Sequence, residues 1–361
     1  MVTPGPHPIF SIASLSLGSC VHHTLPTKIR AAAKLGYDAI EIFIPDFEAF
    51  VTEVNTGDHA DLFSNADWAT VTDVKSLEMM CATAIGRLAR KNQLKITCFQ
   101  PFRQFEGFAG AADAVKAGQS LPPRLKVALD RGESYLRLMP AMKCDLLLVC
   151  SNLLPFDPED FTTWELYRDD LVVAFAELGR IADKYGVNVG FEPLAWGTAV
   201  ARWELVWEVV DLVNLDNVGI ILDSFNCLGA SWADPSQPDG RKAVPESELA
   251  ENLDKLVKTI PPYKIFLYQI ADAARPPSPI QGYKTFPSRM QWSRKMRVFP
   301  MEPEGYLPVQ DFTRAILKMG YKGIWSLEVF NASLDGVEPE VVDNHGQRGI
   351  DGLRRLYAAV A

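Results

Sequence analysis

The sequence predicts one α/β domain over residues 1–361, a (β/α)8 barrel at about 9–361 preceded by an N-terminal extension at 1–8. Short apolar segments rich in β-branched residues alternate with longer segments of helical periodicity, a pattern typical of parallel α/β proteins. Eight strand candidates can be counted, and eight such units close naturally into a barrel. The length of 361 residues also falls within the range of about 200 to over 400 residues for such barrels.

The predicted strands, in chain order, are 9–15, 39–43, 95–99, 145–150, 188–192, 218–223, 265–270 and 323–329. The predicted helices between them are 27–35, 77–92, 125–142, 167–185, 202–213, 246–259 and 309–318. Gly36, Gly186 and Gly320 follow three of these helices, where glycine supplies the left-handed backbone that ends a helix before the next strand. No Gly-x-Gly-x-x-Gly turn follows the first strand, which argues against a Rossmann fold.

Two connections are long enough to cover an active site. The segment 271–308 follows the seventh strand and contains the basic, aromatic phrase "RMQWSRKMR". The polar and acidic segment 50–73 follows the second strand, and we expect a covering loop or short helices there. Long loops after strands lie on the catalytic face of a barrel, so both segments are expected on that face.

Composition excludes several classes of protein. The formal net charge is −9 and no run of Lys or Arg occurs, so we expect neither nucleic acid nor a membrane surface as a partner. The six cysteines include no CxxC pair and are expected to be buried thiols in a reducing compartment. No apolar run approaches the roughly 18 residues of a membrane span, and the N-terminus does not resemble a secretion signal. We expect a cytoplasmic protein with a small-molecule partner; the sequence leaves open whether it is a homo-oligomer.

Four consecutive predicted strands end on side chains that can bind a metal, namely Glu192, Asp223, Gln269 and Glu328. An ionised carboxylate in an apolar strand is costly to bury without a partner, and three at one rim require a cation or protons. The alternative for each acid is that it reaches solvent or caps the following helix. Carboxylate and amide oxygens suit Mg²⁺ or Mn²⁺, and also Co²⁺, better than a structural zinc. The sequence therefore predicts one divalent metal ion at the ends of these strands.

The basic and aromatic residues near the predicted site define a candidate anion pocket. None of the five histidines stands in a predicted strand, which argues against a multinuclear zinc nuclease, and His22 and His23 are expected to be solvated loop residues. Arginine matches a carboxylate with two hydrogen bonds, so an anionic substrate would be met by loop arginines. Aromatic residues near strand ends either wall a pocket or belong to the core. The candidate anion-binding residues are Arg103, Arg289, Arg294 and Arg297, and the candidate aromatic wall residues are Trp196, Phe225 and Trp292.

Several phrases together resemble the fungal and bacterial 3-dehydroshikimate dehydratases of quinate catabolism, within the sugar phosphate isomerase/epimerase-like barrels. They are "FSIASLSLGSC", "YDAIEIF", "CFQPFRQFEG", "FEPLAWG", "ILDSFN", "MQWSRKMRVFP" and "WSLEVFN". The resemblance covers about 9–331. The metal-site phrases are shared across the broad group, whereas "QPFRQFEG" and "SRKMRVFP" are much more specific to the dehydratases.

The resemblance implies that 3-dehydroshikimate is dehydrated to protocatechuate and water through a metal-stabilised enolate. Arg103, Ser293 and Arg297 match the dehydratase positions that bind the substrate carboxylate, and Arg294, Asn226 and Trp196 complete the expected substrate site. Glu192 or Glu328 is the expected base, with metal-bound hydroxide as the alternative. Some relatives carry a histidine two residues after the first metal glutamate or three residues after the metal aspartate. In this chain those positions hold Leu194 and Asn226. The third ligand, often histidine, is Gln269, which makes the site less attractive to zinc.

Two alternatives stay open at this stage. A sugar or inositol isomerase or epimerase would share the metal site, because it acts on the same hydroxy-ketone unit. A catalytically silent barrel that binds a pathway intermediate is the alternative outside enzymes, but none of the four expected ligands is missing. The anion-binding loops around Arg103 and 293–297 are what would distinguish a dehydratase from an isomerase.

Overall fold

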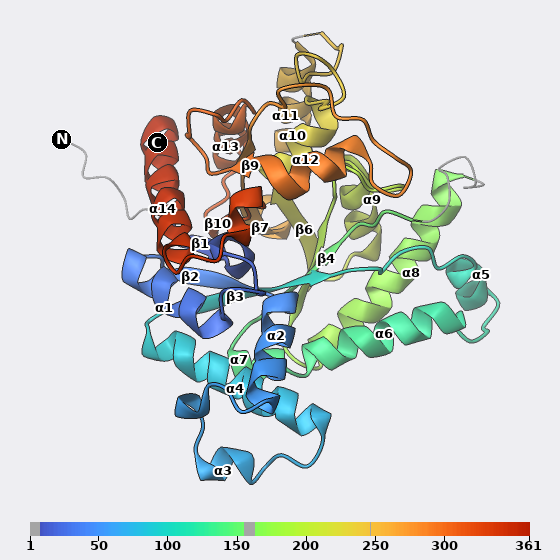
Figure 1. The fold of residues 1–361 in the computed structure, drawn as a ribbon. Coiled ribbons are helices and arrows are strands. Elements are labelled where there is room, and N and C mark those ends of the chain that lie inside the picture. The colour runs from blue at the N-terminus through green and yellow to red at the C-terminus, as the bar shows by residue number, and fades with distance from the viewer. Residues whose placement is uncertain (1–7, 155–162, 246) are drawn as a thin grey trace.

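The computed structural model of the chain describes residues 8–154, 163–245 and 247–361. Within these residues, eight parallel strands form a closed barrel in the order β1-β10-β7-β6-β5-β4-β3-β2. Helices surround this barrel, and α14 (Glu340–Val360), at the C-terminal end, lies beside α1 (Leu25–Leu35) (Figure 1). The predicted α/β barrel is confirmed. Residues 1–7 of the expected N-terminal extension and Glu246, where one predicted helix begins, lie outside the described residues.

The barrel strands are β1 (Phe10–Ala13), β2 (Ala39–Phe43), β3 (Lys95–Phe102), β4 (Leu146–Cys150), β5 (Asn188–Glu192), β6 (Val218–Asp223), β7 (Ile265–Ile270) and β10 (Trp325–Leu327). Strands β2, β5, β6 and β7 have the predicted bounds. Strand β1 is shorter than predicted because the chain turns into a 3-10 helix at Ser14–Leu17. Strand β3 is longer, and β10 ends at Leu327, so that Glu328 directly follows its strand instead of lying within it.

The helices that follow the predictions are α1, α4 (Val74–Lys91), α8 (Trp164–Asp183), α9 (Trp203–Val213), α11 (Ser247–Thr259) and α13 (Val309–Lys318). The predicted helix 125–142 is in fact two helices, α6 (Pro123–Leu136) and α7 (Met139–Met142). Pro140 explains the break, since its ring lacks an amide hydrogen and would clash with the carbonyl of Leu136 in a continuous helix. Gly36 has φ of 86°, the left-handed conformation expected at the end of α1.

The two long connections are more ordered than a loop. After β2 the chain forms α2 (Ile44–Asn55), a 3-10 turn at Ala60–Leu62 and α3 (Asn65–Trp68). After β7 it forms β8 (Asp272–Ala273), α12 (Ser288–Met296) and β9 (Arg297–Val298), and β8 pairs antiparallel with β9. Two further helices follow strands, α5 (Ala111–Lys116) and α10 (Ser224–Ser231). Figure 1 shows α12 and its flanking segments over the barrel, while α3 projects away from it.

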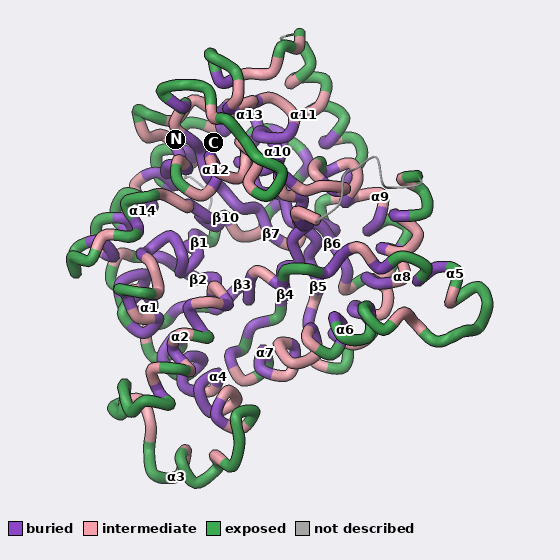
Figure 2. The backbone as a smooth tube through the Cα atoms, turned by 45° about the vertical axis from the view of Figure 1, so that its right-hand side comes forward, coloured by how far each residue is buried: buried purple, intermediate pink, exposed green. Residues whose placement is uncertain are grey.

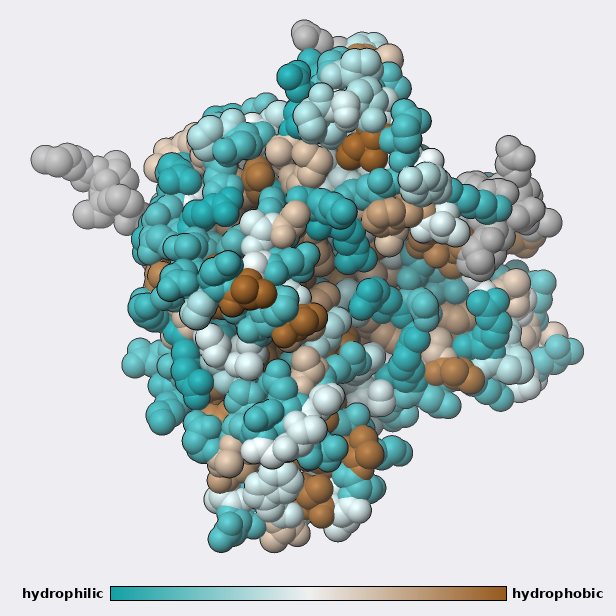
Figure 3. Space-filling view, viewed as in Figure 1, coloured by the Kyte–Doolittle hydropathy of each residue, from teal (hydrophilic) through white to brown (hydrophobic). Residues whose placement is uncertain are grey.

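Burial is concentrated on the barrel strands, whereas the outer loops near α3 and α5 are exposed (Figure 2). Hydrophilic residues cover most of the face shown in Figure 3, with hydrophobic residues only in small groups. Five of the six cysteines are buried, Cys20 is half-buried, and none forms a disulfide, as expected from their spacing. No helix in the described part of the chain is long and apolar enough to cross a membrane.

Candidate active site

The predicted metal ligands lie on adjacent strands because the barrel order places β5, β6, β7 and β10 side by side. Asp223 pairs in register with Gln269, and Leu327, just before Glu328, pairs with Ile270. Parallel strands bring their carboxyl ends to the same rim. Neighbouring strands therefore deliver four oxygen-bearing side chains to the same rim of the barrel.

Three of these side chains form a compact acidic cluster. One carboxylate oxygen each from Glu192, Asp223 and Glu328 lies within 4.8 Å of the others, and all three residues are buried. The Arg297 Nη1 lies 2.8 Å from Asp223 Oδ2 and 3.1 Å from Glu328 Oε2. If ionised, three carboxylates and one guanidinium leave two negative charges in a buried site. A divalent cation would neutralise that charge.

Asp223 caps the following helix, which is the alternative role considered for an acid at the end of a strand. Its Oδ1 accepts a hydrogen bond of 2.7 Å from the backbone amide of Asn226 at the start of α10. Its Oδ2 remains directed to Arg297 in the cluster. Capping and membership of the acidic cluster are thus compatible for this residue.

The amide of Gln269 is oriented so that its oxygen is left without a partner. Gln269 Nε2 donates to Glu41 Oε2 on β2 at 2.9 Å, and Gln269 Oε1 is a buried atom with no hydrogen-bond partner among the described residues. A buried carbonyl oxygen is costly to leave unpaired. An unpaired amide oxygen on β7, the strand between β6 and β10, fits a fourth ligand to a hard divalent metal ion.

Amide side chains hold the two glutamates of the cluster. Gln100 Nε2 donates to Glu328 Oε1 at 3.0 Å, and Asn226 Nδ2 donates to Glu192 Oε1 at 2.8 Å. Burial raises the pKa of Glu192 well above its ordinary value, and the Glu328 and Asp223 carboxylates raise it further. Burial also raises the pKa of Glu328, which the positive charge of Arg297 partly opposes. Burial therefore favours the protonated forms of Glu192 and Glu328, which a bound cation would oppose.

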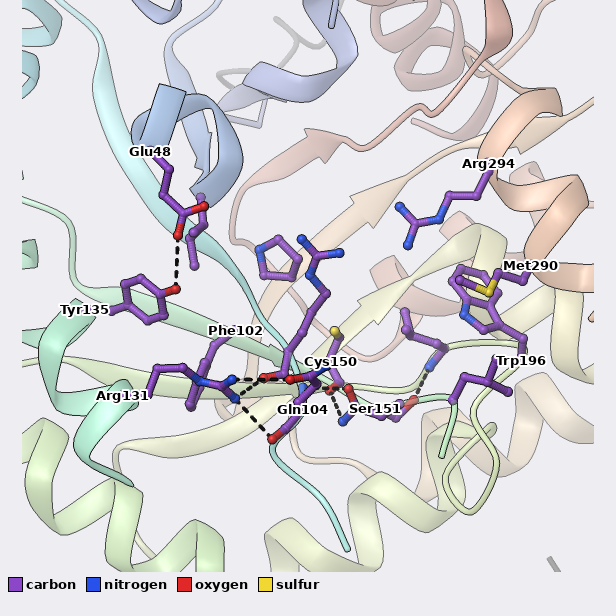
Figure 4. Close-up of a pocket in the computed structure, with 16 residues that line it drawn as sticks. Glu48, Phe102, Gln104, Arg131, Tyr135, Cys150, Ser151, Trp196, Met290 and Arg294 are labelled. Carbon is purple, nitrogen blue, oxygen red and sulfur yellow. Dashed lines mark hydrogen bonds between the residues drawn. The ribbon is translucent and has the colours of Figure 1, made fainter. Parts of the chain in front are cut away.

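A cavity of about 400 Å³ opens beside the cluster, between the loops after β3 and β4 and helix α12. In Figure 4, Arg294 reaches into this cavity from one side, and the hydrogen-bonded pair Glu48 and Tyr135 lies on the opposite side. A smaller adjoining cavity of about 40 Å³ is lined by Arg103, Glu192, Arg294, Arg297, Glu328 and Trp196, among others. Arg103, Arg294 and Trp196 line both cavities. The cavities thus connect an arginine-lined pocket with the carboxylate cluster.

Arg103 and Arg294 of the predicted anion site line both cavities, whereas Arg297 lines only the smaller one. Arg294 is partly buried, and burial lowers its pKa while the neighbouring Arg103 and Arg297 charges lower it further. Three guanidinium groups that repel one another favour a bound anion. Arg103 and Arg294 can therefore bind an anionic group in the open pocket.

The other predicted substrate residues make their hydrogen bonds to protein groups. Arg297 is 1% exposed, and its Nε and Nη2 both donate to Ser293 Oγ at 3.1 Å while its Nη1 contacts the cluster. Asn226 Oδ1 accepts from the backbone amide of Ala195, in addition to the bond that Asn226 donates to Glu192. Arg297, Ser293 and Asn226 are placed to hold the carboxylates in position.

Several other candidates do not line either cavity, although the centre of the Phe225 ring lies 4.2 Å from the guanidinium carbon of Arg297. Arg289 donates to the carbonyls of Gly229 and Ala233 and so anchors the seventh loop. Trp292 is fully buried against Phe225, with ring centroids 4.5 Å apart, so both belong to the core under that loop. His22 is exposed as predicted, but the expectation for His23 was wrong: it is 6% exposed, and its Nε2 lies 2.9 Å from the Gly336 carbonyl.

The sequence prediction missed polar residues on β2 and β3. Glu41 stands between two isoleucines of a buried strand, and Gln100 follows the apolar part of β3; both are fully buried. The argument applied to the last four strands, that a buried polar group needs a partner, would have found both. Arg131 was also missed; its Nη2 donates to the carbonyls of Arg103 and Gln104 and so supports the loop that carries Arg103 (Figure 4). Its helical position gave no signal of that role.

Comparison with known proteins gives the family of the chain. The xylose isomerase-like TIM barrel family matches residues 29–356. The chain is 30% identical to a 3-dehydroshikimate dehydratase of Neurospora crassa, covering 96% of this chain and 92% of that protein. It is 32% identical to a 3-dehydroshikimate dehydratase of Pseudomonas putida, covering 96% of this chain but 41% of the longer relative.

The chain also has the same fold as solved structures of other proteins. A crystal structure described as the IOLI protein with a bound zinc atom superposes with a TM-score of 0.67 and 17% identity, covering 98% of this chain and 99% of that one. At this identity the likeness shows the shared barrel alone. The zinc ion is a feature of that protein.

Proposed function

The chain belongs to the xylose isomerase-like TIM barrel family, and from that premise we propose that it is a hydro-lyase converting 3-dehydroshikimate to protocatechuate and water. One observation carries the proposal. Arg103 and Arg294 line the same small cavity as Glu192 and Glu328. Two guanidinium groups and a metal-competent cluster therefore share one space, which suits a substrate that bears both a carboxylate and a chelating hydroxy-ketone.

The proposed metal site consists of Glu192, Asp223, Gln269 and Glu328. Its donors are all oxygen atoms, three carboxylates and the unpaired amide oxygen of Gln269. This set favours Mg²⁺, Mn²⁺ or Co²⁺ over zinc. When bound, such an ion supplies Lewis-acid polarisation of the substrate ketone and its neighbouring hydroxyl group.

The chain's own side chains perform the remaining steps. Arg103 and Arg294 hold the substrate carboxylate, and Trp196 covers the ring from water. Glu192 or Glu328 accepts the proton from the carbon between the ketone and the leaving hydroxyl. The adjacent C–O bond then breaks, and the hydroxyl leaves as water with the proton that the glutamate has taken up. A proton from the ring CH2 group then moves to the former ketone oxygen, which gives the aromatic product. Arg297, Ser293 and Asn226 keep the carboxylates oriented throughout.

The test uses purified protein depleted of metal and then loaded with Mg²⁺, Mn²⁺, Co²⁺ or Zn²⁺. Mixed with 3-dehydroshikimate, the protein with one of the first three ions is expected to produce the ultraviolet absorbance of protocatechuate. Arg103→Ala should raise the KM about 10-fold to 150-fold, the equivalent of one lost charged hydrogen bond of about 1.5–3 kcal/mol. Arg314→Ala, an exposed arginine on α13, is the matched control and should leave the KM unchanged. Absence of an aromatic product with every ion would overturn the proposal.

The alternative within the family is a sugar or inositol isomerase that uses the same carboxylate cluster. Such an enzyme acts on neutral ketoses and needs no arginine pair in its pocket. The protein would be an isomerase if it did not convert 3-dehydroshikimate and if the wild type and Arg103→Ala turned over a neutral ketose equally well. A barrel that binds 3-dehydroshikimate in a calorimeter but turns over neither substrate would be a silent binding protein.

A further inference from the structure

Glu41 is a buried carboxyl group whose partner is the amide of Gln269. It lies on β2, across the barrel from β7, and both residues are fully buried. Gln269 Nε2 donates to Glu41 Oε2 at 2.9 Å. In the described part of the chain, no lysine or arginine forms an ion pair with Glu41. A buried acid without a cation is unfavourable for folding, so a function is the better explanation for its presence.

We propose that Glu41 is a positioning residue that fixes the orientation of the Gln269 amide, with its oxygen toward the metal site. This inference rests on the proposed metal site. Glutamine differs from the three carboxylate ligands because only one end of its amide can bind a cation. Rotating the amide by half a turn would direct Nε2 at the metal and bring Oε1 against Glu41 Oε2. With Glu41 as a carboxylate, the hydrogen bond would then be replaced by a contact between two acceptor oxygens.

The observed contacts support this division of roles. Gln269 Oε1 has no hydrogen-bond partner among the described residues, as expected for an atom reserved for a ligand. The compact acidic cluster consists of Glu192, Asp223 and Glu328 and does not include Glu41. Glu41 therefore acts through Gln269 and is not itself placed as a ligand. An ionised carboxylate can only accept hydrogen bonds, which matches the observed direction from Gln269 Nε2 to Glu41 Oε2.

The test compares Glu41→Met with Glu41→Gln. Methionine is an unbranched side chain without a comparable acceptor, whereas glutamine retains an amide oxygen that can accept from Gln269 Nε2. Mn²⁺ affinity is measured by isothermal titration calorimetry without substrate. Glu41→Met is expected to weaken Mn²⁺ binding by about 10-fold to 100-fold, the range for lost partners of metal ligands. Glu41→Gln is expected to stay within about 3-fold of the wild type, because it preserves the acceptor.

Stability separates positioning from a purely structural role. The metal-free Glu41→Met protein should unfold within about 4 °C of the wild type, because removal of a buried carboxyl group offsets the loss of the acceptor for Gln269 Nε2. A double-mutant cycle with Gln269→Ala then tests the route of action. In the Gln269→Ala background, Glu41→Met should change Mn²⁺ affinity by less than about 2-fold, because the amide on which Glu41 acts is gone.

Three outcomes would overturn the inference: Glu41→Met binds Mn²⁺ as tightly as the wild type, its effect persists in the Gln269→Ala background, or Glu41→Gln is as defective as Glu41→Met. The last result would assign the effect to charge instead of amide orientation. Failure of the wild type to bind Mn²⁺, Mg²⁺ or Co²⁺ would refute the proposed metal site and this inference together. A wild type that shows the expected Mn²⁺ pattern but does not convert 3-dehydroshikimate would refute only the proposed activity.

Discussion

Replacing Arg297 with methionine removes the cation that contacts the buried acidic cluster. Arg297 is 1% exposed, Asp223 is fully buried and Glu328 is 5% exposed. The Arg297 Nη1 lies 2.8 Å from Asp223 Oδ2 and 3.1 Å from Glu328 Oε2. Methionine keeps a long unbranched side chain but leaves these carboxylates without a counter-charge in the metal-free protein.

Breaking a buried ion pair by removing one partner costs about 3–5 kcal/mol. Unfolding entropy of about 2.1 cal/mol/K per residue gives about 0.8 kcal/mol per degree for this chain. The Arg297→Met protein should therefore unfold about 4–7 °C below the wild type. Burial raises the pKa of Glu328 to about 7 although Arg297 opposes this shift, so removal of Arg297 raises that pKa further. The loss of stability should therefore grow as the pH rises above about 7, where Glu328 ionises in the wild type.

Thermal unfolding in the presence of a chelator, followed by circular dichroism at several pH values, measures this effect. Arg314→Met is the matched control, because Arg314 forms an ion pair with Asp311 in which both side chains are at least half exposed. That variant should lose less than about 0.5 kcal/mol at every pH. If Arg297→Met unfolds within about 1 °C of the wild type at pH 8, well under the loss expected for a broken buried ion pair, the cluster is not charged and paired as described.

Two further substitutions test the loop after β3, which carries Glu106 and is held by Arg131. Burial raises the pKa of Glu106 from 4.5 to about 8, so the stability it contributes is complete below about pH 4.5 and is lost as the pH rises through about 8. The unfolding temperature of Glu106→Gln should fall less over that pH range and should be higher than that of the wild type at pH 9. Parallel curves of unfolding temperature against pH for the two proteins would contradict the assigned pKa. Arg131→Leu removes the hydrogen bonds to the carbonyls of Arg103 and Gln104, and should raise the KM for 3-dehydroshikimate about 10-fold with kcat within about 2-fold. Steady-state kinetics measures this effect, and Arg124→Leu is the control because Arg124 is an exposed arginine on the same helix. Equal KM values for the two variants would contradict the prediction.

Local sequence was sufficient for most of the barrel. Strands β2, β5, β6 and β7 have the predicted bounds because an apolar run between a glycine or polar turn and a polar end is a signal contained within a few residues. The predicted helix 125–142 failed where a single local rule was overlooked, since Pro140 divides it into α6 and α7. The position of Glu192, Asp223 and Gln269 at one rim also followed from sequence, because parallel strands place their carboxyl ends together.

Contacts between distant strands could not be read from the sequence in the same way. Gln269 meets Glu41, and Gln100 meets Glu328, across 228 residues of chain in each case. Arg297 was expected at the substrate carboxylate, yet its guanidinium lies against Asp223 and Glu328. A side chain in a loop has several directions open to it, and only its packing against other elements selects one.

The sequence by itself determined the number of βα units, the strands that end on metal-competent oxygens and the loops that carry the arginines. Each of these depends on the order and spacing of neighbouring residues. Tertiary structure alone decided which arginines face the pocket, which one neutralises the acidic cluster, and which end of the Gln269 amide faces that cluster. Those choices depend on closure of the barrel, which brings β2 near β7 and β3 near β10 and so pairs Glu41 with Gln269 and Gln100 with Glu328.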